Sequence, residues 1–238
     1  MYYDDALRLE AARSLQERLG RLGLDPGLAV SDLHATVVSG MSAYQRWREQ
    51  TEIELPPERV WTEYIFRDGG LPADRLAAAA EDLTFYYENS FYRRTLRPEV
   101  PEALASLRER GLRLAVISNI VSRRLVPHNL AAYGVAHYFD PIVTSAGLGI
   151  RKPHARIFLE TARLMGLPAC ACAYVGDTVS RDVVGARRAG YGLAIQIKSF
   201  LTGKSDRETD VEAPDALIHD LREVVTLVTG GRQESLRG

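Results

Sequence analysis

The chain has 238 residues, with 30 basic and 31 acidic side chains and a net charge of -1. A balance this even gives no global field that favours nucleic acid or an anionic membrane over a small solute. Hydrophobic residues make up 46% of the chain, and no apolar run approaches the roughly 20 residues that span a bilayer. These figures predict a soluble protein that buries a sizeable core and has no nucleic-acid and no membrane partner.

The N-terminus and the cysteines predict a cytoplasmic location. The segment from Met1 to Asp5 has neither the basic start nor the apolar stretch of a secretory signal. Cys170 and Cys172 are separated by one residue, a spacing that disfavours a mutual disulfide within a strand. Two thiols without clustered histidines are also too few for a structural zinc site. Reduced cysteines are typical of cytoplasmic proteins.

Residues 5–92 predict an all-helical segment. Apolar residues recur at helical spacing over 5–23, 30–47, 57–66 and 72–92, with proline or glycine in the breaks. Aromatic side chains on these helices can line a substrate pocket, but aromatics at helical spacing more often pack in a core. We therefore expect packing to account for most of them: Tyr44, Trp47, Trp61, Tyr64, Phe66, Phe85, Tyr86, Tyr87, Phe91 and Tyr92.

From Pro98 onwards, helical patterns alternate with short apolar strands. Such alternation predicts an α/β fold, in which a doubly wound parallel sheet is covered by helices on both faces. The predicted strands are residues 112–117, 142–144, 171–175, 193–197 and 216–218. The predicted helices are residues 101–110, 121–133, 154–165, 179–189 and 221–228, with a polar loop at 204–214.

Polar side chains follow three of these strands. Ser118 and Asn119 come directly after one strand and offer a hydroxyl and an amide, which suit an anion. Lys152 stands in a loop before a helix, where it can neutralise a phosphoryl group. Asp177 and Asp182 follow a third strand as oxygen ligands for a hard cation such as Mg2+. Taken singly, each has a simpler interpretation, namely a turn, a surface charge and helix-capping acids.

In this order, the motifs resemble those of the haloacid dehalogenase-like hydrolase superfamily, a family with a Rossmann-like core. The resemblance covers Phe91 to about Val228. The motifs that carry it are Leu114–Asn119, Gly149–Pro153 with Ile157-Phe158, Tyr174–Asp177, Asp182, and Gly185-Ala186.

The resemblance implies roles for the polar residues. Ser118 and Asn119 would hold a phosphoryl group, Lys152 would stabilise its charge, and Asp177 would bind Mg2+. Asp182 would support either the metal shell or the lysine. Because phosphoryl transfer needs a divalent metal and cationic groups, whereas halide displacement needs no such metal, the set favours a Mg2+-dependent phosphatase of a small phosphorylated metabolite.

The resemblance also implies a division of the chain into domains. Residues 1–92 would form a helical cap that closes over the site and sorts substrates. Residues 93–229 would form the α/β core, without its first strand, and residues 230–238 a disordered tail.

One family motif is missing from the chain. The family's nucleophile is the first aspartate of an Asp-x-Asp or related motif that ends the first, central strand. Here Asp4 and Asp5 are adjacent, and no apolar strand precedes them. They are better explained as acids at a helix N-terminus. The covalent chemistry of the family therefore has no nucleophile in this sequence.

Two explanations of the missing motif stay open. In one, Met1 is an internal methionine taken as the start, and the motif lies upstream. In the other, the chain is a natural pseudoenzyme that binds phosphate or a protein without catalysis. Unpaired inner strands and a core-sized gap are costly in a folded protein, which favours truncation. This account predicts that strands 112–117 and 171–175 are not directly paired and that a groove lies between them.

Overall fold

The computed structural model describes residues 5–92, 94–199 and 213–230. Contacts divide the chain into two compact units. The helical unit comprises residues 1–94, 119–128 and 145–149, and the sheet unit comprises the rest. Most of the predicted polar loop and the predicted tail beyond Gly230 lie outside the described residues.

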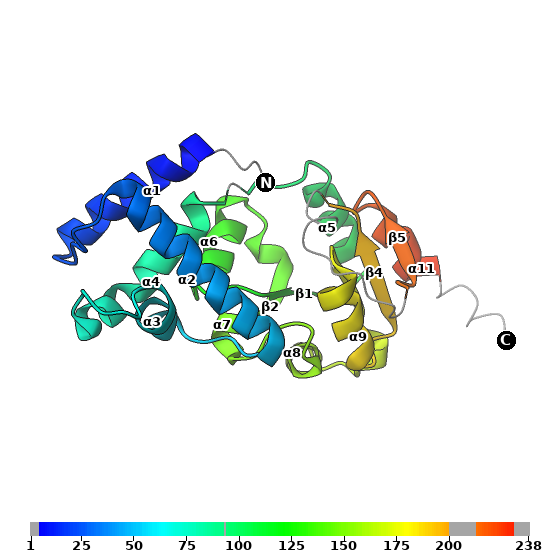
Figure 1. Ribbon diagram of the computed structural model, residues 1–238. Coiled ribbons are helices and arrows are strands. Elements are labelled where there is room, and N and C mark those ends of the chain that lie inside the picture. The colour runs from blue at the N-terminus through cyan, green and yellow to red at the C-terminus, as the bar shows by residue number, and fades with distance from the viewer. Residues whose placement is uncertain (1–4, 93, 200–212, 231–238) are drawn as a thin grey trace. The chain divides into compact units, whose positions relative to one another are not determined.

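The helical unit is built mainly from the segments predicted to be helical (Figure 1), and it also contains a short helix at 145–148 that the pattern did not predict. Prolines and glycines separate its helices, as the sequence pattern indicates. The elements are α1 (Asp5–Arg21), α2 (Val30–Thr51), α3 (Pro57–Val60), the π-helix η1 (Trp61–Ile65), α4 (Ala73–Ser90) and the short α7 (Ser145–Leu148), with the start of α6 (Leu125–Ala132).

Buried side chains from α1, α2, η1 and α4 form the core of the helical unit. Four of the aromatic residues lie in it, because Tyr44, Trp61, Phe66 and Tyr87 are each at most 9% exposed. The Trp61 indole donates a hydrogen bond of 2.8 Å to the hydroxyl of Thr84, so its one polar atom is satisfied inside the core. For these four residues, the prediction of a packing role is confirmed.

The sheet unit alternates helices and parallel strands. Its elements are α5 (Val100–Glu109), β1 (Leu114–Ser118), the end of α6, η2 (Ala136–Tyr138), β2 (Phe139–Thr144), α8 (Ala155–Leu164), η3 (Ala169–Ala171), β3 (Ala173–Gly176), the π-helix η4 (Val179–Val183), α9 (Val184–Arg188), β4 (Leu193–Ile197), β5 (Ala216–Ile218) and α11 (Glu223–Gly230).

Every strand pair among the described residues is parallel, which confirms the predicted α/β class. The strands form two sheets, β1-β2 and β3-β4-β5. Consecutive residues of β4 point to opposite faces, and Ala194, Ile195 and Gln196 are all buried, so both faces of this strand are covered. Ile195 packs with Leu107 of α5 and Val224 of α11.

One predicted helix begins later than expected. The pattern predicts a helix from Val121, whereas α6 begins at Leu125. The backbone N–H groups of Val121 and Ser122 instead donate to the carboxylate of Glu88, at 3.1 and 2.9 Å. Contacts with a distant side chain thus replace the first turn that local periodicity indicates.

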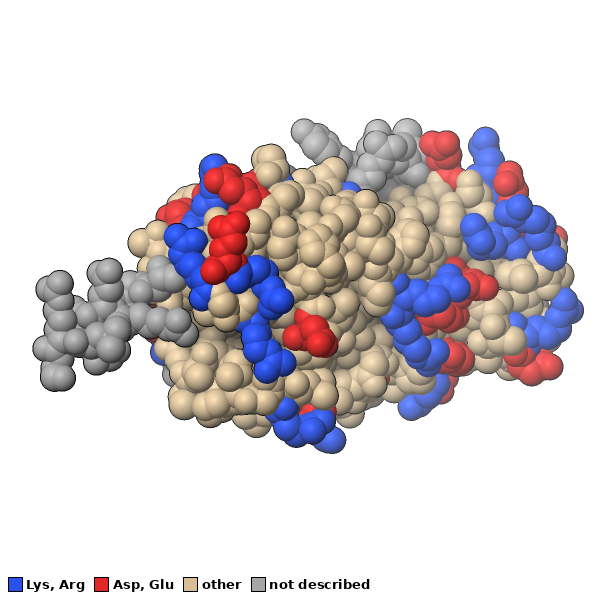
Figure 2. Space-filling view, turned by 180° about the vertical axis from the view of Figure 1, so that it is seen from behind, with Lys and Arg blue, Asp and Glu red and all other residues tan. Residues whose placement is uncertain are grey.

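None of the described helices is long and apolar enough to cross a membrane. On the face drawn in Figure 2, basic and acidic side chains lie next to one another in several groups, with uncharged surface between the groups. This mixture agrees with the even charge balance of the sequence.

Candidate active site

Ser118 and Asn119 stand at the carboxyl end of β1. The strand is a short apolar run, and its last residue, Ser118, lies opposite Thr144 at the end of β2. Asn119 is the next residue, and both side chains are half-buried. The sequence therefore placed both residues correctly at a strand end, where ligands bind in open parallel sheets. Their role toward a phosphoryl group stays a prediction.

Lys152 and Asp182 form a buried ion pair. The Lys152 Nζ lies 2.7 Å from Asp182 Oδ1, and the two side chains are 12% and 3% exposed. Nζ also donates to the hydroxyl of Tyr174 at 2.7 Å. Two residues that lie 30 positions apart in the sequence are thus held together in the sheet unit.

Both oxygens of Asp182 are fully engaged. Oδ1 accepts from Lys152 and from the Tyr174 hydroxyl at 3.1 Å. Oδ2 accepts from the backbone N–H and the hydroxyl of Thr178, at 3.0 and 2.8 Å. A carboxylate has about four acceptor positions, so these contacts leave Asp182 little capacity to bind a metal. Its contacts are those of a partner for the lysine.

The electrostatics of this cluster follow from burial and charge. Burial alone would raise the pKa of Asp182, but the Lys152 ammonium and the hydrogen bonds from Thr178 outweigh it and lower the pKa to about 2. Burial, and then the Asp182 carboxylate, raise the pKa of the Tyr174 phenol. At neutral pH Asp182 is therefore an ionised carboxylate and Tyr174 a neutral phenol.

A π-turn and a glycine bring Asp182 back to the end of β3. The N–H of Val183 bonds the carbonyl of Thr178, five residues earlier, which widens the first turn after the strand. A Cβ at Gly176 would lie 2.3 Å from Asp182 Cγ, so only glycine leaves room for the carboxylate. Sequence reasoning missed the contributions of Tyr174, Thr178 and Gly176. The adjacency of Thr178 to the Gly-Asp pair was the available signal.

Asp177 is the residue directly after β3. It is half-buried, and its Oδ2 accepts from the hydroxyl of Ser199 at 3.0 Å, a residue that the sequence did not suggest. The described residues contain no cluster of three or more metal-binding side chains. Mg2+ commonly binds through one or two carboxylates and completes its shell with waters and substrate phosphate. A single half-buried carboxylate fits that manner of binding.

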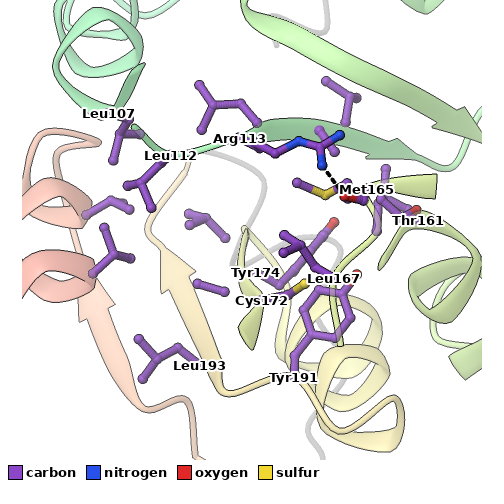
Figure 3. Close-up of a pocket in the computed structure, with 18 of the residues that line it drawn as sticks. Leu107, Leu112, Arg113, Thr161, Met165, Leu167, Cys172, Tyr174, Tyr191 and Leu193 are labelled. Carbon is purple, nitrogen blue, oxygen red and sulfur yellow. Dashed lines mark hydrogen bonds between the residues drawn. The ribbon is translucent and has the colours of Figure 1, made fainter. Parts of the chain in front are cut away.

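A cavity of about 640 Å³ lies between β1 and β3 in the sheet unit (Figure 3). Leu114–Ile117 of β1 and Ala173–Val175 of β3 line it, with apolar side chains of α5 and α11. Within the described residues β1 pairs with β2 and β3 pairs with β4, so the two strands that line the cavity are not paired with each other. The predicted unpaired strands and the groove between them are therefore confirmed.

A comparison with protein-family models identifies the family of the chain. The model of the haloacid dehalogenase-like hydrolases matches residues 4–190. The chain belongs to this family. The match includes Ser118, Asn119, Lys152, Asp177 and Asp182, the residues whose roles the resemblance implies.

Relatives within the family include named phosphatases. The chain is 28% identical to a glyceraldehyde 3-phosphate phosphatase of Methanopyrus kandleri over 96% of this chain and 92% of that protein. It is 37% identical to a phosphoserine phosphatase of Thermus thermophilus over 70% of this chain and 63% of that protein. Among solved structures, a 2-haloacid dehalogenase from Pseudomonas syringae matches with a TM-score of 0.63 over 97% of this chain and 94% of that protein. The two sequences are 23% identical, so this likeness supports the fold alone.

Proposed function

We propose that the protein acts in the Mg2+-dependent hydrolysis of phosphoric monoesters of small metabolites. The observation that carries the proposal is the buried Lys152–Asp182 pair beside Asp177, at the end of the strand that carries the Gly-Asp motif. The names of the relatives agree with this class, since three of them are phosphatases of glyceraldehyde 3-phosphate, phosphoserine and phosphoglycolate. Each of these substrates is a small molecule with one phosphate ester.

Each site residue has a role in the proposed reaction. Ser118 and Asn119 would donate hydrogen bonds to the phosphoryl oxygens. Lys152 would stabilise their charge as its ammonium is held in place by Asp182. Asp177 would hold Mg2+, which when bound neutralises charge on the transferring group. Asp182 is assigned to the lysine because its oxygens are occupied by other donors.

The nucleophile needs a carboxylate that the site residues do not supply. We propose that an apolar strand ending in an aspartate occupies the groove between β1 and β3, because both of those strands line it with apolar side chains. The aspartate oxygen would bond to phosphorus while the ester P–O bond breaks and the released alcohol takes up a proton. Water would then cleave the acyl phosphate, giving inorganic phosphate and restoring the carboxylate.

A phosphatase assay with a generic aryl phosphate and Mg2+ tests the proposal. It compares this chain with one extended upstream in the reading frame so that it includes an apolar strand ending in aspartate. We expect turnover in the extended chain only, and loss of turnover when Lys152→Met is introduced there. Glu63→Gln, an exposed side chain paired with Arg59, serves as the matched control.

The alternative is a binding module of the same family without catalysis. The observation that favours it is that no aspartate of this sequence ends an apolar strand in the family's first motif. Inactivity of both chains, combined with binding of inorganic phosphate, would support the binding module. Turnover by this chain without extension would contradict the proposed source of the nucleophile.

A further inference from the structure

The loop that follows Ser118 and Asn119 is held by side chains of the helical unit. Five consecutive backbone N–H groups each donate to a side chain rather than to another backbone group. The bonds are Ile120 to Ser145 Oγ at 2.9 Å, Val121 and Ser122 to Glu88 at 3.1 and 2.9 Å, and Arg123 and Arg124 to Glu81 at 3.2 and 3.4 Å.

Two acids of α4 supply most of these acceptors. Glu81 and Glu88 are seven residues apart on α4, which is about two helical turns, so they share one face of the helix. Glu88 is 6% exposed, and its two oxygens each accept one of the two consecutive N–H groups. Glu81 also accepts from the hydroxyl of Ser122 at 2.7 Å. Two carboxylates on one face of α4 thus accept hydrogen bonds from consecutive N–H groups of the loop.

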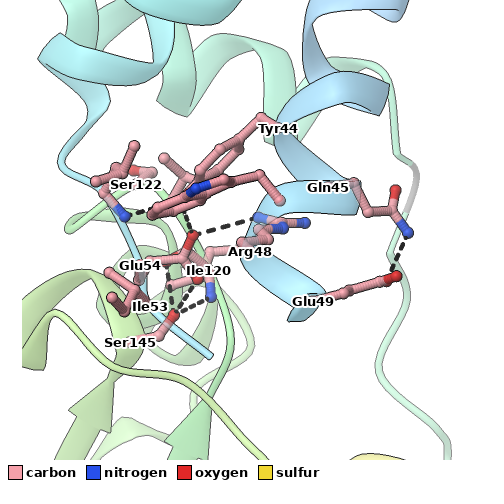
Figure 4. A network of polar contacts seen from close by, with 12 residues as sticks. Tyr44, Gln45, Arg48, Glu49, Ile53, Glu54, Ile120, Ser122 and Ser145 are labelled. Atoms are coloured by element: carbon pink, nitrogen blue, oxygen red, sulfur yellow. Dashed lines mark hydrogen bonds and ion pairs between the residues drawn. The ribbon is translucent and has the colours of Figure 1, made fainter. Parts of the chain in front are cut away.

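A third acid acts through Ser145 (Figure 4). Glu54 is 3% exposed and accepts from the Ser145 hydroxyl at 2.7 Å, while that same hydroxyl oxygen accepts from the N–H of Ile120. Tyr44 donates to Glu54 at 2.5 Å, and Arg48 lies 3.4 Å from it as the counter-charge. Every one of these residues belongs to the helical unit.

Capping of α6 does not explain the arrangement. An N-cap satisfies the first N–H groups of a helix, and α6 begins at Leu125. Ile120, Val121 and Ser122 precede that start by three to five residues, yet they receive the most buried acceptors. Burial raises the pKa of Glu88 and opposes its charge, while the N–H groups of Ser122 and Val121 and the charge of Arg48 counteract this effect. A buried carboxylate at this place is therefore costly without the loop.

We infer that Glu88 and Glu81 are positioning residues, which fix the loop 120–124 and thereby set the geometry with which Ser118 and Asn119 meet a phosphoryl group. The carboxylates occupy the N–H donors that an anion would otherwise meet in such a loop. A phosphoryl anion would then meet Ser118 and Asn119, the two residues just before the loop. This inference rests on the proposed phosphate-binding role of Ser118 and Asn119.

The variant Glu88→Gln tests the inference on the full chain. Glutamine keeps the size but replaces one acceptor with an N–H2 donor that faces a backbone N–H. We expect the amides of Val121 and Ser122 to exchange hydrogen at least about tenfold faster. We also expect the affinity for inorganic phosphate, measured by isothermal titration calorimetry, to fall about fivefold, which corresponds to about 1 kcal/mol.

Two further variants keep the test decisive. If Glu88→Gln does not fold, Glu81→Gln carries the test, since this side chain is 20% exposed. It should speed hydrogen exchange at the amides of Arg123 and Arg124, which donate to Glu81, and weaken phosphate binding by a smaller factor. Glu63→Gln, an acid on η1 that bonds Arg59, should have neither.

The outcomes separate this inference from the proposed function. Unchanged exchange of the loop amides would overturn the inference, as would faster exchange with unchanged phosphate affinity. If the unmodified chain binds no inorganic phosphate, the proposed phosphate-binding role of Ser118 and Asn119 in this chain is wrong, and the exchange rates alone then decide whether the acids fix the loop. Turnover of the extended chain tests the proposed function separately.

Discussion

Replacing Asp182 with asparagine tests whether its carboxylate keeps the Lys152 ammonium stable inside the sheet unit. The substitution keeps the size of the side chain, but it removes the charge and turns one acceptor into a donor. Breaking a buried ion pair from one side costs about 3–5 kcal/mol. The lowering of the pKa of Asp182 to about 2 indicates a stabilisation on the order of 2 kcal/mol, which includes the bonds from Thr178. We therefore expect a loss of about 3 kcal/mol in the free energy of unfolding.

Urea unfolding at pH 7, followed by circular dichroism, measures this loss. Adding Lys152→Met to Asp182→Asn should recover most of it, because the stranded ammonium is then removed. Glu160→Gln, which breaks an exposed pair with Arg163, serves as the control and should change nothing measurable. The reasoning is refuted if Asp182→Asn stays within about 0.5 kcal/mol of the unmodified chain, or if the double variant is no more stable than the single one.

Three further predictions concern the charge of Asp182 and the packing around individual glycines. Because the folded pKa of Asp182 is lowered, its stabilising contribution is present above about pH 4 and should be lost as the pH falls toward about 2; urea midpoints across this range should fall more steeply for the unmodified chain than for Asp182→Asn. Gly176→Ala should displace Asp182, since the new Cβ would lie 2.3 Å from Cγ, and should destabilise the chain by about 1–3 kcal/mol in urea. Gly40→Ala should destabilise the chain by a similar amount, because its Cβ would lie 2.6 Å from Ile65 Cα. Gly20→Ala has open space around it and should instead stabilise α1 by up to about 1 kcal/mol. Equal effects at the two helical glycines would contradict the packing argument.

Local periodicity was enough to locate three of the strands. The strands β1, β3 and β4 are apolar runs bounded by polar or glycine residues, and their ranges agree with the prediction to within two residues. The pattern failed where a distant side chain competes for the backbone. The turn before Leu125 is the clearest case, since Glu88 binds its N–H groups from 33 and 34 positions away.

In the candidate site, too, the sequence predicted some contacts and missed others. The order of the motifs assigns Lys152 and Asp182 to one site. In the structure, Lys152 Nζ and Asp182 Oδ1 lie 2.7 Å apart. The sequence left open whether Asp182 serves the metal or the lysine. That choice depends on Thr178 and Tyr174, whose hydrogen bonds need the π-turn and the missing Cβ of Gly176. Neither feature has a periodic signature.

The ion pair also bears on why a cation is needed. Lys152 and Asp182 neutralise one another, so together they offer a phosphoryl group polarity but no net positive charge. A phosphate group near neutral pH carries about -1.5 to -2 charges, which favours a divalent cation at Asp177.

We therefore expect Mg2+ to tighten binding of inorganic phosphate by about tenfold, or about 1.4 kcal/mol. Titration calorimetry with Mg2+ and with a chelator measures this difference. Asp177→Asn should abolish the Mg2+ effect and leave the metal-free affinity unchanged. Equal affinity of the unmodified chain in both buffers would remove Asp177 from the proposed metal role.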